Sequence, residues 1–220
     1  MNSLRLRIRQ FGMYSAFSQI MRAALRGMYR VEQHLVFIIP GFKPPVFCDS
    51  SIVPLTAERI AQASNVGELS AKEAKALKGF LDNGCLGLCA EFDGRLAGYA
   101  WLQFTGEYRF GHAGRMSIPP KHVVLNNLLV FPDYRGHGLG NKLVLARLAR
   151  IPSEWHPETF IIPENRSSIK NCENQGFQRI LHIKCWKWFR GPWHMRIERL
   201  KNSPEAIELE NALKKGNPNL

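Results

Sequence analysis

The sequence predicts one α/β (α+β) domain, and three observations support that class. First, apolar runs typical of strands alternate with segments of helical spacing along most of the 220 residues. Second, two strand patterns flank Asp93-Gly94, which is a strong signal for a hairpin turn. Third, a buried strand pattern from Val123 leads through a glycine-rich turn into an amphipathic helix that ends near Arg150. A hydrophobic content of 45% is enough for an ordinary packed core.

The first 33 residues are expected to form a basic amphipathic helical extension, separate from the main domain at 34–201. Six arginines come before the first acidic residue, Glu32, and Arg22, Arg26 and Arg30 repeat every four residues beside an apolar stripe. Three interpretations stay open for this segment. It can be a helix packed at the domain edge, an interfacial helix on an anionic membrane, or a transit-type presequence.

Periodicity and boundary residues place the other elements in chain order. Helical spacing from Thr56 to Leu81 breaks near 65–67, with Thr56 and Ser70 as helix caps. The segment 105–120 is expected to be a loop or a strand extension, and the tail at 202–220 to hold one short helix from Pro204 through Leu213. The remaining elements are strands at 34–39, 85–92, 96–104, 159–162, 178–188 and 194–200, and a short helix that ends at Gly176.

Composition and charge restrict the class of protein further. The five cysteines are an odd number, and Cys85 and Cys89 lack a second pair that would complete a zinc site. We therefore expect free thiols in a reducing, cytoplasmic compartment, with no disulfide framework and no metal. No apolar run reaches the roughly 18 residues of a membrane span. The formal net charge of +12 permits a phosphorylated cofactor, nucleic acid, anionic lipid or an acidic carrier protein as partner.

The most informative segment is the turn between the strand from Val123 and the following helix, Arg135-Gly136-His137-Gly138-Leu139-Gly140. Glycines let successive backbone N–H groups approach an anion, and the helix start adds unpaired N–H donors. The P-loop pattern is absent, because Asn141-Lys142-Leu143 follows Gly140, and the third glycine comes one residue too early for the dinucleotide fingerprint. The turn therefore predicts a site for a phosphorylated ligand of another kind.

Two motifs in this chain resemble those of the GNAT superfamily of acetyl-CoA-dependent N-acetyltransferases. Arg135, Gly138 and Gly140 match its Arg/Gln-x-x-Gly-x-Gly/Ala pyrophosphate loop. The segment Asn165–Phe177 is similar to its second signature, Asn-x-x-(Ala/Ser)-x-x-x-Tyr-x-x-x-Gly-Phe, in which Ser167 or Ser168 can cap the short helix. The order of predicted elements from 35 to 200 also matches this superfamily.

The resemblance implies a GNAT fold, a mixed and mostly antiparallel central sheet whose central strands splay apart between flanking helices. The pantetheine arm of acetyl-CoA, the acyl-donor cosubstrate, would lie in that gap against the backbone of 128–130, and the Val130 N–H could polarise the thioester carbonyl. The implied coenzyme A contacts are Leu128, Leu129, Val130, Arg135, Gly136, His137, Gly138, Leu139, Gly140, Asn141 and Asn165.

The resemblance also raises the question of which residues move protons. Cys172 stands where the family often has a Tyr that serves as general acid, and a thiol is a weak donor. The general base stays open among Glu164, Glu91, Glu107 and His122. Amides inside an apolar strand are costly unless hydrogen-bonded, so one of two adjacent asparagines is expected to face the cleft. The candidate catalytic residues are Asn126, Asn127, Cys172 and Glu164.

These features predict an N-acetyltransferase that transfers acetyl from acetyl-CoA to a primary amine of a small molecule or protein by direct attack. Two alternatives stay open. One is a longer-chain N-acyltransferase that takes its acyl group from acyl-CoA or acyl carrier protein, with peripheral contact of residues 1–33 at the inner membrane surface. The other is a catalytically weak module that binds acyl-CoA. The aromatic and basic residues of 186–193 fit packing better than nucleic-acid binding, and no pattern identifies the acceptor.

Overall fold

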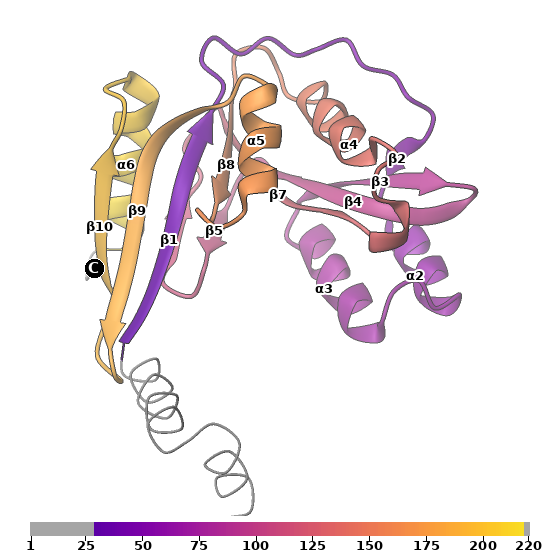
Figure 1. The fold of residues 1–220 in the computed structure, drawn as a ribbon, viewed down its shortest axis with the longest axis horizontal. Coiled ribbons are helices and arrows are strands. Elements are labelled where there is room, and N and C mark those ends of the chain that lie inside the picture. Colours follow the sequence, from indigo (N-terminus) through magenta and orange to yellow (C-terminus); the bar gives the residue numbers. More distant parts are fainter. Residues whose placement is uncertain (1–28, 218–220) are drawn as a thin grey trace, which may run out of the picture.

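The structure, a computed structural model, describes residues 29–217, and their centre is one eight-stranded mixed sheet (Figure 1). The expected helix at the N-terminus, with its three interpretations, lies outside these residues. The strand order is β10-β9-β1-β8-β7-β4-β3-β2, and β5 and β6 form a separate two-stranded sheet. The strands are β1 (Tyr29–Ile38), β2 (Ile52–Pro54), β3 (Leu86–Phe92), β4 (Arg95–Gln103), β5 (Glu107–Phe110), β6 (Gly114–Ser117), β7 (His122–Val130), β8 (His156–Ile161), β9 (Gln178–Trp188) and β10 (His194–Arg199).

Five α-helices and a short 3-10 turn complete this part of the chain. They are α2 (Ala57–Asn65), α3 (Ala71–Asp82), the 3-10 turn Pro132–Tyr134, α4 (Leu139–Leu148), α5 (Arg166–Asn174) and α6 (Pro204–Gly216). The predicted caps are confirmed, since Thr56 caps α2 and Ser70 forms a reciprocal capping box with Glu73. The predicted hairpin is also confirmed, because Asp93 and Gly94 both have positive φ, 50° and 73°, between β3 and β4. No helix of 29–217 is long and apolar enough to cross a membrane.

The first strand differs from the prediction in both length and place. β1 begins at Tyr29, five residues before the expected boundary, so 29–33 belong to the sheet and are not helical. The reason is long-range pairing, since β1 is antiparallel to β9 from Tyr29↔Trp188 onward and to β8 on its other edge. Pairing on both edges outweighs the local helical spacing of this segment. A strand from the start of the chain thus lies between two strands of its C-terminal part (Figure 1).

Helices cover both faces of the sheet. On one face, α2 and α3 pack on β3 and β4 around Leu77 and Trp101. On the opposite face of the same strands lies α4, whose Leu143 and Ala146 contact Leu88 and Ala100. α5 joins this second layer in a cluster with β7 and β1. The arrangement confirms the predicted fold, a mixed and mostly antiparallel sheet flanked by helices.

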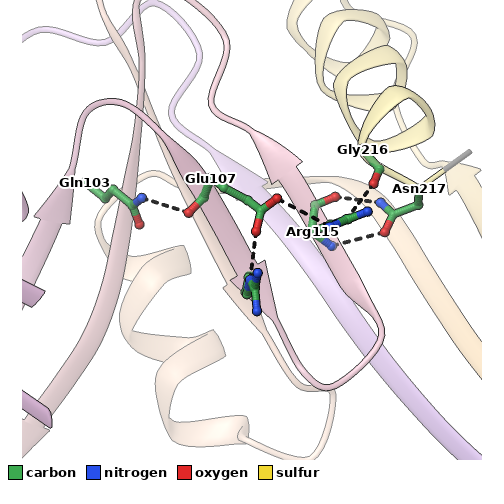
Figure 2. A network of polar contacts seen from close by, with 6 residues as sticks. Gln103, Glu107, Arg115, Gly216 and Asn217 are labelled. Atoms are coloured by element: carbon green, nitrogen blue, oxygen red, sulfur yellow. Dashed lines mark hydrogen bonds and ion pairs between the residues drawn. The ribbon is translucent and has the colours of Figure 1, made fainter. Parts of the chain in front are cut away.

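The segment predicted as a loop or strand extension folds into the β5–β6 hairpin, which α6 holds against the sheet. Residues Leu209 and Leu213 of α6 are fully buried beside Met116 of β6, so 202–217 is part of the core. Figure 2 shows the polar contacts of this hairpin: the Gln103 side chain donates to the Glu107 carbonyl, and the Arg115 Nε donates to the Gly216 carbonyl at 3.0 Å. The second contact joins segments about a hundred residues apart, and local periodicity does not reveal it.

Candidate active site

The site begins where β7 separates from β8. The two strands pair in parallel only from His122↔His156 to Val124↔Glu158. One further contact, from the Thr159 Oγ1 to the Leu125 carbonyl at 2.9 Å, follows this pairing. Beyond Leu125 the edge of β7 no longer pairs with β8, whereas its other edge stays paired with β4 as far as Val130. The predicted splay of the central strands is therefore present.

A β-bulge distorts β7 at the point of separation. Trp101 pairs with Asn126 and Tyr99 pairs with Leu129, so β7 has one residue more than β4 in this interval. Asn127 lies inside this bulge and has a φ of +41°, which is uncommon for a residue other than glycine. The bulge changes the directions of the two amide side chains, and both Asn126 and Asn127 line the cavity described next.

A cavity of about 900 Å³ opens between the diverging strands. Its walls come from β1, α3, β4, β5, β7, α4, β8 and α5, which are far apart in sequence. Of the predicted site residues it is lined by Asn126, Asn127, Leu128, Asn165 and Cys172. Glu164 is exposed and does not line the cavity, although it adjoins Asn165.

The glycine-rich turn has the backbone geometry expected of a phosphate-binding loop. Gly136 and Gly138 have φ of +87° and +73°, and a Cβ atom added at either position would meet no other group within 4 Å, so the loop surface is open. Gly138 is the N-cap of α4 and no side chain caps this helix, so its first N–H groups are free for an anion. The exposed residues Arg135, Gly136, His137, Gly138 and Asn141 surround this helix start, with Leu139 buried beneath them and Gly140 half-buried.

Val130 links this loop to the cavity. The N–H of Phe131 donates to the Ala97 carbonyl at 3.0 Å, and in an antiparallel pair successive residues alternate in direction. The Val130 N–H therefore points away from β4, toward the side that β8 has left. The Val130 carbonyl accepts a hydrogen bond from the Arg135 Nε at 3.3 Å, which connects the loop to the strand end. The Val130 N–H and the free N–H groups at the start of α4 thus belong to one continuous strand-to-helix segment.

The second motif forms α5 with one difference from the prediction. Asn165 is itself the N-cap, because its Oδ1 accepts from the Ser168 N–H at 3.2 Å and from the Ser167 hydroxyl at 3.0 Å. Neither serine caps the helix, since both lie inside its first turn. Gly176 has a φ of +85° just after the helix, as predicted.

Cys172 faces the cavity from α5 and is half-buried. Burial raises the pKa of its thiol to about 11, and the nearby Arg147 only partly opposes this. The thiol is therefore protonated at neutral pH. A free thiol has a pKa of about 8.5, so proton transfer from Cys172 to a coenzyme A thiolate is unfavourable.

The candidate bases of the sequence analysis lie in very different places. His122 is fully buried, its Nδ1 3.3 Å from the Glu158 Oε2, and does not line the cavity. Glu91 forms an ion pair with Arg59. Glu107 does line the cavity, but its carboxylate pairs with Arg109 and lies 3.8 Å from Arg115 (Figure 2).

Two buried basic residues that line the cavity were not among the predicted site residues. His34 of β1 is 7% exposed, and its Nε2 has no hydrogen-bond partner among the described residues. Arg147 of α4 is 5% exposed and its Nε also lacks such a partner. A signal for Arg147 existed, because it occupies an apolar position in the helical spacing of 143–148. His34 had no local signal, since only sheet topology brings β1 to the cavity.

The site contains no evident metal centre within 29–217, where no group of three or more His, Cys, Asp or Glu side chains is placed to hold an ion.

The chain belongs to the acetyltransferase (GNAT) family, whose model matches residues 56–177, more than half of its length. This match covers the glycine-rich turn and the Asn165 motif, and it leaves out β1, β2, β9, β10 and α6. No curated protein sequence matches this chain.

Several solved structures are similar in fold. One, from Novosphingobium aromaticivorans DSM 12444, is described as an acetyltransferase of the GNAT family; it has 20% identity and a TM-score of 0.51, with 78% of this chain and 66% of that chain covered. A tandem GNAT protein from the clavulanic acid biosynthesis pathway has 17% identity and a TM-score of 0.50, with 84% and 59% covered. An aminoglycoside N-acetyltransferase in complex with CoA has 20% identity and a TM-score of 0.42, with 58% and 91% covered. This chain spans less than two thirds of the length of the first two.

Proposed function

We propose that this protein is an N-acetyltransferase that transfers the acetyl group of acetyl-CoA to a primary amine. The observation that carries the proposal is the continuity of the site. An uncapped helix start behind Gly138 leads along β7 to a cavity that opens where β7 leaves β8. Acetyl-CoA has a pyrophosphate group in its nucleotide part and a thioester at its other end, so the site suits both parts of this donor.

The reaction is a single displacement at the thioester carbonyl. The amine nitrogen attacks the carbonyl carbon, a C–N bond forms, the C–S bond breaks, and coenzyme A leaves as a thiolate that takes a proton from solvent. The Val130 N–H, directed away from β4, would donate to the carbonyl oxygen as negative charge develops there. Cys172 would pack beside the thioester and not serve as the acid, because its pKa lies above that of the leaving thiol.

The amine must lose a proton, and His34 is the residue we propose as base. Burial lowers the pKa of His34, with Glu32 and Glu164 opposing, so its imidazole is neutral at pH 7. A Cβ on Gly111 would lie 2.9 Å from the His34 Nε2, so this nitrogen faces the turn of the β5–β6 hairpin, which also lines the cavity. The Asn126 Oδ1, buried and without a hydrogen-bond partner among the described residues, can accept a bond from the amine and orient it.

The proposal is tested with the purified chain, acetyl-CoA and a panel of primary amines. The expected result is release of coenzyme A that depends on both the amine and the protein, with an acetylated amine of the correct mass. Stabilisation by acetyl-CoA in a thermal-shift assay, without transfer to any amine of a broad panel, would favour the alternative of a module that only binds acyl-CoA.

The second candidate, an acyltransferase at a membrane surface, is favoured by one surface feature. Trp188 and Phe189, at the turn between β9 and β10, are 61% and 64% exposed. The Trp188 ring lies 4.5 Å from that of Tyr29, where the arginine-rich segment 1–28 joins the sheet, and Arg190 follows Phe189. Exposed aromatic rings beside basic residues suit the interface of an anionic membrane. A longer acyl donor, or acyl carrier protein, would fit that location.

Liposome co-sedimentation tests this candidate. The full chain should sediment with anionic vesicles, and the double variant Trp188→Ser/Phe189→Ser and a chain starting at residue 29 should sediment less. The truncation must stop at residue 28, because β1 begins at Tyr29. Equal sedimentation of all three proteins would exclude the membrane surface as partner.

A further inference from the structure

The cavity contains one buried cation without a counter-ion among residues 29–217. Arg147 lies in the last turn of α4, is 5% exposed and lines the cavity with Asn126 and Cys172. No carboxylate of this part of the chain forms an ion pair with Arg147. Five other arginines there do form ion pairs, each with a Glu side chain. Burial lowers the pKa of Arg147 to about 10, so the side chain still carries its charge at neutral pH.

The hydrogen bonds of the guanidinium leave one edge without a partner among the described residues. Nη1 donates to the Trp101 carbonyl at 3.4 Å and to the Asn126 carbonyl at 3.3 Å, the two residues that pair beside the bulge. Nε, although buried, donates to no described residue. The edge that Nε shares with Nη2 is a planar fork that matches the two oxygens of a carboxylate.

A buried charge that lacks a partner is costly, and an anion of matching geometry relieves that cost. We propose that Arg147 binds a carboxylate group of a substrate inside the cavity, so that the enzyme prefers an acidic substrate over its neutral counterpart. This inference rests on the proposed acyltransferase function and identifies the chemical class of what the cavity accepts. The carboxylate can come from the far end of a dicarboxylic acyl group or from the acceptor amine.

Two pairs of substrates of matched size distinguish these sources. In the donor arm, succinyl-CoA is compared with butyryl-CoA, which has the same number of acyl carbons and no carboxylate. In the acceptor arm, β-alanine is compared with propylamine, with acetyl-CoA as donor. Binding of the two acyl-CoAs and of β-alanine and propylamine is also measured by thermal shift and calorimetry, so that the result does not depend on turnover.

The variants are Arg147→Met, Arg147→Lys and, as a matched control, Arg150→Met. Arg150 is exposed at the same helix end and does not line the cavity. We expect the wild-type chain to favour the acidic member of one pair by roughly 10- to 100-fold, in keeping with hydrogen bonds to a charged group. Arg147→Met should abolish the preference, Arg147→Lys should keep part of it, and Arg150→Met should keep all of it.

The inference is overturned if neither arm shows a preference in the wild-type chain, or if Arg147→Met keeps it. Should Arg147→Met fail to fold, Arg147→Lys decides by the same comparison, because it retains charge but not the planar fork. Failure of the proposed function has a different signature: selective binding of the acidic ligand with no transfer from any acyl-CoA would refute the acyltransferase and leave the role of Arg147 intact.

Discussion

Both ends of β7 carry polar side chains within an apolar strand, but the surroundings of these side chains differ. At its first end, His122 pairs with His156 of β8, and its ring lies 3.3 Å from the Glu158 Oε2 and 3.4 Å from the Glu208 Oε2 of α6. At its other end, Asn126 and Asn127 are equally polar, but β8 has diverged and the cavity takes its place. At this closed end, paired with β8, the His122 ring thus lies between two carboxylates of the protein, although its Nε2 and the Glu158 Oε1 form no hydrogen bond among the described residues. At the open end, where β8 has diverged, the polar side chains line the cavity.

The difference shows that a polar residue in an apolar strand does not by itself mark a site. His122 and Asn126 lie on the same strand, and both are buried. What distinguishes them is whether the neighbouring strand supplies a partner. The closed end should therefore determine stability and the open end binding and turnover, and the following variants test that division.

The largest effect is expected from His122→Ala, which leaves Glu158 fully buried without its hydrogen-bond partner. Burial raises the pKa of Glu158 and His122 opposes that rise, so the carboxyl must become neutral or stay charged without compensation. We expect the free energy of unfolding to fall by about 3–5 kcal/mol in urea denaturation at pH 7. The affinity of the folded fraction for coenzyme A should not change. His182→Ala, on β9 and half-buried, is the control, and an equal loss in both would contradict a special role for the buried pair.

Gly138→Asp should act on the open end alone. A carboxylate at the start of α4 repels phosphate at short range, an effect of up to about 4 kcal/mol at an effective dielectric constant near 20. We expect the dissociation constant for coenzyme A to rise by roughly 100-fold or more in calorimetry. Gly67→Asp is the matched control, because Gly67 has a φ of +79° against +73° and lies in the turn between α2 and α3. If both variants bind equally well, the glycine-rich turn does not hold the phosphates.

His34→Gln tests the proposed base. We expect kcat to fall on the order of 100-fold, the range for loss of a general base. Because burial lowers the pKa of His34, the base is active above that pKa and kcat/KM should decline below about pH 6.5. The variant should lose this acidic limb, whereas His182→Gln should keep it. A pH profile of unchanged shape in His34→Gln would assign the proton to another group.

The lowered pKa of His34 also makes the stability of the folded protein depend on pH. The pKa of His34 is lower in the folded protein than in the unfolded chain, so at acidic pH the unfolded chain binds the additional proton. The contribution of His34 to the free energy of unfolding is therefore complete above its unfolded pKa near 6.5 and is lost as the pH falls. Urea denaturation between pH 5 and pH 8 should show a smaller dependence on pH in His34→Gln.

The smallest effect is expected from Cys172→Ala. A thiol with a pKa of about 11 is a poor acid for a thiolate that is already a fair leaving group. We expect kcat to change by less than about threefold in a steady-state assay, and Cys172→Tyr to give no gain in rate. A large loss in Cys172→Ala that Cys172→Tyr partly restores would instead assign the acid role to this position.

Local sequence signals were sufficient to predict the helix caps, one hairpin and the glycine-rich turn. The caps at Thr56 and Ser70, the Asp93-Gly94 hairpin and the glycine-rich turn each depend on residues within a few positions of one another, and all three structural elements are present. Where the prediction failed, the cause was distant. The strand at 29–33 exists because of pairing with β9, and the β5–β6 hairpin is held by α6.

The sequence by itself determined the family, the sheet-and-helix fold and the loop suited to coenzyme A, because these follow from short-range spacing and backbone geometry. Only the tertiary structure decided which polar residues face the cavity. His34 lines the cavity because β1, which precedes the family match, belongs to the sheet. Arg147 is buried without a counter-ion among the described residues, and His122 lies outside the cavity, at the closed end of β7. The physical reason is that burial and the presence of a partner are properties of neighbouring strands and helices, and residues far along the chain supply them.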